Sequence, residues 1–76
     1  MKNIAILGST GSIGRQALEV ASANKDKVKI TALAANSNDE LLEQQIEAFK
    51  PEMAVLSDKT AADRLIKRYQ GKTTIL

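Results

Sequence analysis

The stretch IAILGSTGSIG, residues 4–14, joins an apolar run to a glycine-rich turn and the start of a helix. Its first four residues are continuously apolar and are followed by Gly8, which favours a short buried strand over a helix. From Ile13 to Ala23, apolar residues recur at helical spacing. A strand, a tight turn and a helix N-terminus in this order predict an anion-binding site, because the first N–H groups of a helix have no partner inside it.

The rest of the chain repeats the strand–helix order. Residues 28–35, 53–56 and 73–76 are predicted strands, and helices are expected to begin near Ser37, which has Glu40 at capping-box spacing, and near Asp58. This alternation predicts an α/β fold, a Rossmann-like three-layer αβα half-domain with a parallel sheet. Right-handed crossovers and the usual arrangement of dinucleotide-binding folds predict the strand order 3-2-1-4.

Periodicity also predicts which side chains share a face. The apolar face expected for the first helix consists of Ile13, Ala17, Val20 and Ala21. The second strand is expected to alternate between two sets of residues, Val28, Ile30, Ala32 and Ala34 on one face and Lys29, Thr31 and Leu33 on the other.

The composition excludes several kinds of site. The 76 residues include no cysteine and no histidine, so no thiolate and no imidazole is available as nucleophile, base or metal ligand. A net charge of +2, one Tyr, one Phe and no Trp argue against nucleic-acid binding. The sequence has neither an apolar run long enough to cross a membrane nor a signal peptide. We therefore expect a cytoplasmic protein with no membrane or nucleic-acid partner.

The three glycines of the turn have separate expected roles. Gly8 would allow the tight exit from the strand, and Gly14 would let the helix pack closely on that strand. Gly11 would let a pyrophosphate approach the backbone. The spacing differs from the G-x-G-x-x-G fingerprint in its first interval. A turn that needs glycine only for packing is the alternative interpretation.

Other groups of the turn add possible phosphate donors. The hydroxyls of Thr10 and Ser12 are candidates, as are the N–H groups of Ser12 and Ile13 at the helix start. The sequence lacks the Gly-Lys-Ser/Thr of a Walker loop, which disfavours ATP or GTP hydrolysis.

The end of the second strand indicates which dinucleotide would bind. NAD-selective folds place Asp or Glu there, against the ribose 2′-hydroxyl. Here Asn36, Ser37 and Asn38 stand at that position, and the first carboxylates, Asp39 and Glu40, come later. These three residues can donate hydrogen bonds to a 2′-phosphate, which favours NADPH over NADH. Ser37 or Asn38 can equally serve as the cap of the second helix.

The motif of residues 8–14, so close to the start of the chain, resembles that of 1-deoxy-D-xylulose 5-phosphate reductoisomerases. The likeness continues through LAANSN, residues 33–38, and through Pro51, Ala54 and Val55. The resemblance implies that residues 1–76 are the N-terminal part of an NAD(P)-binding Rossmann-like domain, with the catalytic domain outside the chain. It implies an enzyme that rearranges 1-deoxy-D-xylulose 5-phosphate and reduces the product with NADPH, using Mg or Mn, to give 2-C-methyl-D-erythritol 4-phosphate for non-mevalonate isoprenoid synthesis.

The resemblance also assigns residues. Thr10, Gly11, Ser12 and Ile13 match the turn that contacts the pyrophosphate, and Asn38 matches an asparagine near the adenosine ribose. The chain departs from the family at two positions, with Asn36 where glycine is usual and Ser37 where a basic residue is common. The family's metal and sugar-phosphate residues lie downstream, so we expect no metal ligand and no catalytic residue here, and an inactive isolated chain. The cofactor-binding residues predicted in all are Gly8, Thr10, Gly11, Ser12, Ile13, Gly14, Asn36, Ser37 and Asn38.

Two alternatives remain open from the sequence. The turn also suits another NAD(P)-dependent dehydrogenase of the short-chain or semialdehyde type, and the lack of catalytic groups suits a non-catalytic nucleotide-binding module. We expect the strand at residues 53–56 and the last strand to form the sheet edges. Apolar edge strands invite pairing between chains, so we expect the isolated chain to self-associate. We separately expect the whole protein to be a homo-oligomer.

Overall fold

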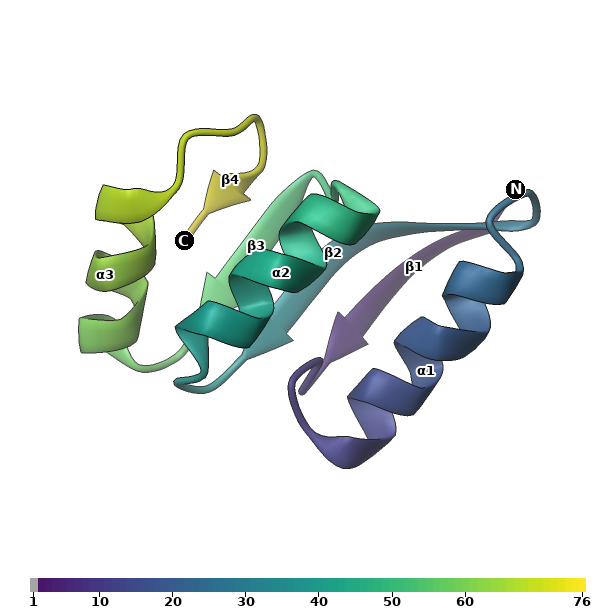
Figure 1. Cartoon of the computed structure of the whole chain (residues 1–76), viewed down its shortest axis with the longest axis horizontal. Helices are drawn as coiled ribbons and strands as arrows, with labels where there is room; N and C mark the ends of the chain where they lie inside the picture. Colours follow the sequence, from purple (N-terminus) through teal and green to yellow (C-terminus); the bar gives the residue numbers. More distant parts are fainter. Residues whose placement is uncertain (1) are drawn as a thin grey trace.

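A computed structural model describes residues 2–76, which form four strands and three helices in strict alternation (Figure 1). In chain order these are β1 (Lys2–Leu7), α1 (Ser12–Ala23), β2 (Val28–Ala35), α2 (Asp39–Phe49), β3 (Met53–Leu56), α3 (Lys59–Arg68) and β4 (Thr74–Ile75). The predicted α/β class and the parallel sheet are confirmed, since all three strand pairs are parallel.

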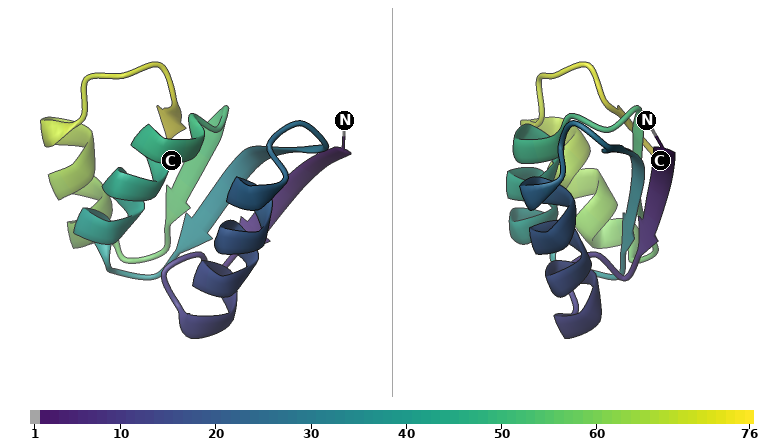
Figure 2. Two further views of the ribbon diagram at one scale, coloured as in Figure 1. Left: turned by 45° about the vertical axis from the view of Figure 1, so that its right-hand side comes forward. Right: turned by 90° about the vertical axis from the view of Figure 1, so that its right-hand side faces the viewer.

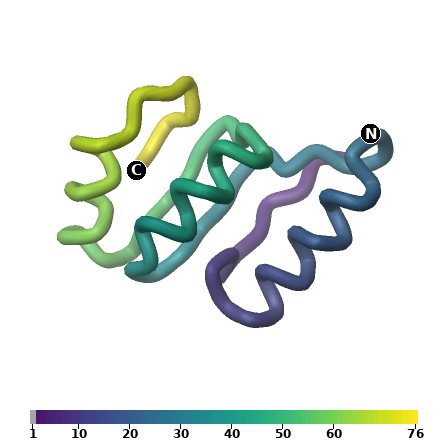
Figure 3. Tube along the Cα trace, in the orientation of Figure 1, coloured from purple at the N-terminus to yellow at the C-terminus, as the bar shows by residue number. Residues whose placement is uncertain are grey.

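The predicted strand order 3-2-1-4 is wrong. The observed order is β1-β2-β3-β4, so each strand pairs with the next one in the sequence. In Figure 3 the last strand lies against the segment of β3, on the far side of the sheet from β1. The edges within the described residues are therefore β1 and β4, and β3 is an interior strand, not an edge as expected. The prediction placed β4 beside β1 by analogy with dinucleotide-binding folds. In the structure, the crossover from β3 to β4 runs in the same direction as the two crossovers before it, so β4 lies beside β3.

The predicted three-layer arrangement is also wrong for the described residues. Three right-handed crossovers that all advance in one direction leave their helices on the same face of the sheet. Figure 2 shows this arrangement, with the helices on one side and the strands on the other. Residues 2–76 therefore form two layers, and the opposite face of the sheet has no helix from this part of the chain.

A β-bulge reverses the predicted faces of β2. The register between β1 and β2 shifts after the Ile4–Ile30 pair, and Ala5 pairs with Ala32. One extra residue exchanges the two faces of a strand from that point on. Leu33 is consequently fully buried under the helices, whereas Ala32 and Ala34, expected on the buried face, are only partly buried.

The buried stripe of α1 differs from the predicted one. Its buried residues are Gly14, Leu18 and Ala21, whereas Ile13 and Val20 are 83% and 64% exposed. The helix is turned because Gly14, which has no side chain, lies against the turn. Ile13 and Val20 instead flank the open side of β1, where residues 2–76 provide no neighbour.

The core lies between the sheet and the helices. Its fully buried side chains include Leu33 of β2, Leu42 and Ile46 of α2, and Leu65 of α3. Burying one such side chain stabilises the fold by about 1.5–3 kcal/mol. In the described part of the chain, no helix has the length and apolar character needed to cross a membrane. The core thus fixes α2 and α3 on the sheet, and with them the loops at the carboxyl ends of the strands.

Candidate functional site

The turn between β1 and α1 has the geometry predicted for Gly8 and Gly14. Gly8 has a φ of +67°, in the left-handed region that side chains rarely adopt. A Cβ at Gly14 would collide with the carbonyl oxygen of Gly8 and would lie 2.7 Å from the Cα of Ser9. These two glycines are therefore required by the fold itself.

Gly11 differs from the other two glycines. It is the N-cap of α1, with φ −81° and ψ 174°, which is an extended conformation open to any residue. A Cβ there would have its nearest contact at 3.4 Å, with the Gly8 oxygen. Packing alone therefore does not explain a glycine at this position.

Backbone N–H groups line the start of α1. The Gly11 N–H is used within the turn, where it donates to the Gly8 carbonyl at 3.0 Å. The helical ladder begins with the Arg15 N–H, which donates to the Gly11 carbonyl at 2.9 Å. The N–H groups of Ser12 and Ile13 precede that first bond, so they have no acceptor inside the helix. They and the helix dipole provide a partial positive charge without a charged side chain.

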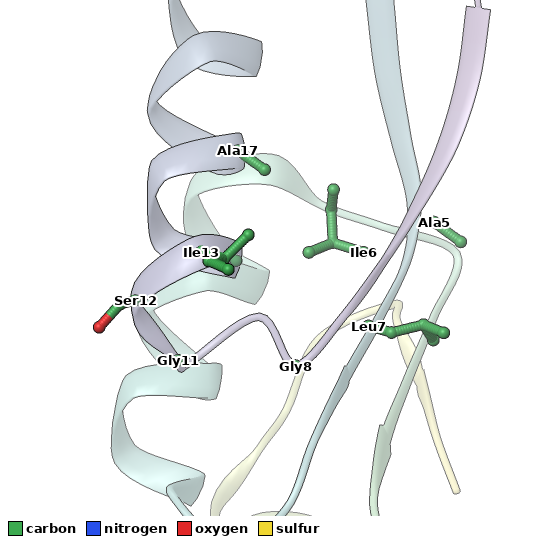
Figure 4. Close-up of a pocket in the computed structure, with 9 residues that line it drawn as sticks. Ala5, Ile6, Leu7, Gly8, Gly11, Ser12, Ile13 and Ala17 are labelled. Carbon is green, nitrogen blue, oxygen red and sulfur yellow. The ribbon is translucent and has the colours of Figure 1, made fainter.

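An open hollow of about 520 Å³ lies between the turn, α1 and the exposed side of β1 (Figure 4). Figure 4 shows Ile6 pointing toward the helix, whereas Ala5 and Leu7 point to the other side of the strand and Ser12 points outward. The lining is mostly apolar and includes Gly11 and Ile13. No lysine or arginine belongs to it, so an anion here would be held by backbone N–H groups.

The loop after β2 lies beside this turn. Ser9 donates its N–H to the carbonyl of Ala34 at 2.9 Å, which joins the turn to the end of β2. Asn36, Ser37 and Asn38 follow and are exposed. The structure thus brings the two predicted groups of cofactor-binding residues to the carboxyl ends of adjacent strands.

Asn38 is the N-cap of α2. Its side-chain Oδ1 accepts a hydrogen bond from the Leu41 N–H at 3.1 Å. The predicted capping box of Ser37 and Glu40 is therefore wrong by one residue, because the helix begins at Asp39. The other predicted cap is confirmed, since Asp58 accepts from the Ala61 N–H at 3.1 Å at the start of α3.

Asn36 does not need the backbone of a glycine. Lys50 is the one non-glycine residue with positive φ among those described, so Asn36 lies outside the left-handed region. Its Oδ1 accepts from the Ser57 hydroxyl at 2.6 Å, and its carbonyl accepts from the Asp58 N–H at 2.9 Å. Ser57 was not among the site residues predicted from the sequence. That residue also follows a strand parallel to β2, and the shared position at the strand ends was the available signal.

The first carboxylate after this loop in the sequence, that of Asp39, is neutralised by arginines. Asp39 is 5% exposed and forms ion pairs with Arg64 and Arg68 of α3, both at 3.0 Å. The hydrogen bond from Arg64, with a further one from Arg68, lowers the pKa of Asp39 below its ordinary value. Arg68 also pairs with Glu43 at 2.7 Å. The negative charge of Asp39 therefore faces α3, and it is compensated there.

Comparison with known proteins agrees with this geometry. The family model of 1-deoxy-D-xylulose 5-phosphate reductoisomerase matches residues 4–76. The chain is 49% identical over 75 residues to the 1-deoxy-D-xylulose 5-phosphate reductoisomerase 1 of Bacillus cereus, an alignment that covers 99% of the chain. It is 47% identical over 75 residues to the reductoisomerase of Protochlamydia amoebophila. The chain spans 20% of the length of each of these relatives.

Solved structures give the same relationship. The Zymomonas mobilis reductoisomerase in complex with NADPH superposes with a TM-score of 0.90 at 28% identity, over 97% of this chain and 20% of that one. A DOX-P reductoisomerase in complex with NADPH, fosmidomycin and magnesium superposes with a TM-score of 0.94 at 26% identity, over 100% of this chain and 19% of that one. The sequence match across residues 4–76 and the shared fold show that this chain belongs to the 1-deoxy-D-xylulose 5-phosphate reductoisomerase family.

Proposed function

We propose that this chain binds the adenosine and pyrophosphate part of NADPH, as the N-terminal part of a 1-deoxy-D-xylulose 5-phosphate reductoisomerase. The observation that carries the proposal is Gly11 at the N-cap of α1. Serine, threonine, aspartate and asparagine usually occupy this position, because their side chains accept a hydrogen bond from the helix. Gly11 forgoes that bond although its backbone suits any residue. A glycine that the fold does not require is expected where a ligand must approach the backbone closely.

The donors around Gly11 fit a pyrophosphate. The free N–H groups of Ser12 and Ile13 would donate to its oxygens, and the hydroxyls of Thr10 and Ser12 would add neutral donors. Gly8 and Gly14 would act indirectly, by holding the turn against the helix. Relatives solved with NADPH support this assignment.

The loop after β2 supports NADPH over NADH. The exposed residues Asn36, Ser37 and Asn38 would donate to the 2′-phosphate, and the first carboxylate that follows them, Asp39, is paired with two arginines. A carboxylate that bonded the ribose 2′-hydroxyl would instead repel this phosphate. Ser37 lacks the charge of a basic residue, so we propose a moderate preference that depends on neutral donors.

In the longer protein, this chain would hold the cofactor while other parts of the polypeptide bind the substrate and a divalent metal, Mg or Mn. NADPH would supply the hydride that reduces the aldehyde formed when 1-deoxy-D-xylulose 5-phosphate rearranges, which gives 2-C-methyl-D-erythritol 4-phosphate. Residues 2–76 contain no group of three His, Cys, Asp or Glu side chains able to hold a metal. We propose that the isolated chain is inactive and that the whole enzyme is a cytoplasmic homo-oligomer.

A titration of the 76-residue chain with NADPH, NADH and adenosine 2′,5′-bisphosphate tests the proposal. Amide chemical shifts should move at Ser12 and Ile13 with each ligand. They should also move at Ser37 and Asn38, more strongly with the 2′-phosphorylated ligands. Equal effects of NADH and NADPH would remove the claim about the 2′-phosphate, and the absence of shifts at the turn would overturn the proposal.

The variant Gly11→Ser makes this test specific. Serine is a good N-cap in the extended conformation found here, so the variant should fold at least as stably as the wild type. Its side chain would occupy space that we assign to the pyrophosphate, and NADPH binding should weaken. Unchanged NADPH binding by Gly11→Ser would show that this glycine has no role toward the ligand.

A further inference from the structure

A buried glutamine from α2 holds the turn between β1 and α1. The side-chain Nε2 of Gln45 donates a hydrogen bond of 2.8 Å to the carbonyl oxygen of Ser9. Gln45 is 7% exposed and Ser9 is 0% exposed. Among the described residues it is the side-chain hydrogen bond that joins the most distant positions in the sequence, which are 36 residues apart. It connects the first strand–helix unit to the second.

Both backbone polar groups of Ser9 are held by that second unit. Its carbonyl accepts from Gln45 of α2, and its N–H donates to Ala34 of β2 at 2.9 Å. The same unit carries the loop of residues 36–38. The two groups of predicted cofactor-binding residues are thus connected through Ser9.

The Gln45 amide uses only one of its two polar atoms for a hydrogen bond within the described residues. Its other amide atom, Oε1, has no hydrogen-bond partner among the protein atoms described, and neither has the buried hydroxyl of Ser9. Buried polar atoms without partners are destabilising. Methionine at this position would remove the donor to the Ser9 carbonyl, which is itself buried. The one hydrogen bond that the Gln45 side chain forms within the described residues is therefore the bond to the Ser9 carbonyl.

That bond fixes the orientation of a complete peptide unit. The carbonyl of Ser9 and the N–H of Thr10 belong to one planar trans peptide, in which the two groups point in opposite directions. Because Gln45 holds the carbonyl toward α2, the Thr10 N–H must point away from α2. Thr10 is the partly exposed residue between Ser9 and Gly11. Without the amide, this peptide unit could rotate about its flanking bonds.

We propose that Gln45 is a positioning residue for the phosphate-binding turn, which orients the Ser9–Thr10 peptide toward the pyrophosphate of the dinucleotide. The inference rests on the proposed function, because it assumes that the turn receives a pyrophosphate. The proposal assigns a role in the site to a residue of α2. This helix lies outside the two loops, residues 8–14 and 36–38, that were predicted from the sequence to form the site.

The test compares Gln45→Met with Gln44→Met in the 76-residue chain. Gln44 is the neighbouring exposed glutamine, so its variant matches the chemical change without touching Ser9. The ligands are NADP⁺, which contains a pyrophosphate, and adenosine 2′-monophosphate, which does not. Gln45→Met should weaken NADP⁺ binding about three- to tenfold, the range for one lost hydrogen bond. It should leave adenosine 2′-monophosphate binding unchanged, and Gln44→Met should match the wild type with both ligands.

A second variant, Gln45→Glu, keeps the test decisive if Gln45→Met fails to fold. An ionised glutamate can only accept hydrogen bonds, so it cannot bond the Ser9 carbonyl. A protonated glutamate can donate, and burial raises the pKa at which this occurs. NADP⁺ binding by Gln45→Glu should therefore recover as the pH falls, relative to the wild type at the same pH. Arg15 and Glu19 of α1 line the hollow that Gln45 borders, and the wild type measured at each pH is the control for every group other than residue 45.

Each outcome separates the two proposals. Wild-type affinity of Gln45→Met for both ligands would overturn the positioning role, as would an equal loss with both ligands or a Gln45→Glu variant that shows no recovery. Failure of the wild-type chain to bind NADP⁺ would instead overturn the proposed function, and the inference with it.

Discussion

The carbonyl oxygen of Gly8 occupies the place that a Cβ on Gly14 would need. The neighbouring Cα of Ser9 and carbonyl carbon of Gly8 would lie 2.7 and 2.8 Å from that Cβ. All three obstacles are backbone atoms of a turn that is also held by Ala34 and Gln45. The turn therefore has little freedom to move away from a larger residue at position 14.

Replacing Gly14 by alanine should destabilise the chain by about 1–3 kcal/mol, the usual range for an overpacked site. Urea unfolding followed by circular dichroism would measure the change. Gly11→Ser is the matched control, with an expected change within about 0.5 kcal/mol, because it adds a Cβ where the nearest contact is 3.4 Å. Equal stability of Gly14→Ala and wild type would contradict the close packing of α1 on the turn.

The local features of this chain could be predicted from its sequence. The roles of Gly8 and Gly14 and the Asp58 cap depend on residues within a few positions, and the structure confirms them. The α/β class followed from the alternation of short apolar runs with helical patterns. The site residues themselves stay predictions, although their positions at the ends of β1 and β2 agree with the proposal.

The features that the sequence did not predict depend on distant contacts. The position of β4 beside β3 is decided by the direction of the last crossover, which leaves no local pattern. The bulge opposite Ile4 depends on the pairing of two strands, and one extra residue reversed the predicted faces of β2. Gln45 appeared as an ordinary helical residue, because its partner Ser9 lies 36 positions away.

Asn38 offers a way to separate helix capping from ligand binding. Asn38→Ala removes the acceptor for the Leu41 N–H and should destabilise the chain by about 1 kcal/mol. Asn38→Asp keeps the cap, and its charge favours the helix N-terminus, so stability should be maintained or raised. That same charge should lower the affinity for NADPH relative to NADH. If Asn38 serves only as a cap, Asn38→Asp will bind both dinucleotides as the wild type does.

The Asp39 ion pairs should give the chain an acid-sensitive component of stability. The pKa of Asp39 is lower in the folded chain than its ordinary value of 3.8, chiefly because Arg64 donates a hydrogen bond to it. A lowered folded pKa means that the contribution is complete above the unfolded pKa and is lost as the pH falls through the folded one. Wild type should therefore exceed Asp39→Asn in urea midpoint at neutral pH, and the difference should shrink below about pH 4.

The control for this experiment is Asp63→Asn. Asp63 is an exposed aspartate on α3 that forms no ion pair within residues 2–76. Its urea midpoint should follow that of the wild type at every pH. A difference between wild type and Asp39→Asn that stays constant into strong acid would show that the arginine pairs contribute nothing through this titration.

The open edge at β1 should cause the isolated chain to self-associate. Leu7 is 81% exposed on the face of the sheet that carries no helix, and β1 pairs on one side only within residues 2–76. Ile13, 83% exposed, adds an apolar side chain on α1, on the other side of the same edge. Exposed apolar surface beside an unpaired strand edge favours pairing between chains.

Sedimentation should show a weight-average mass that rises with concentration, and Leu7→Lys should reduce that rise. Ile66→Lys, which places the same charge on the 50% exposed Ile66 of α3, should leave it unchanged. A clean monomer at high concentration, or equal effects of the two lysine variants, would mean that this edge does not direct association.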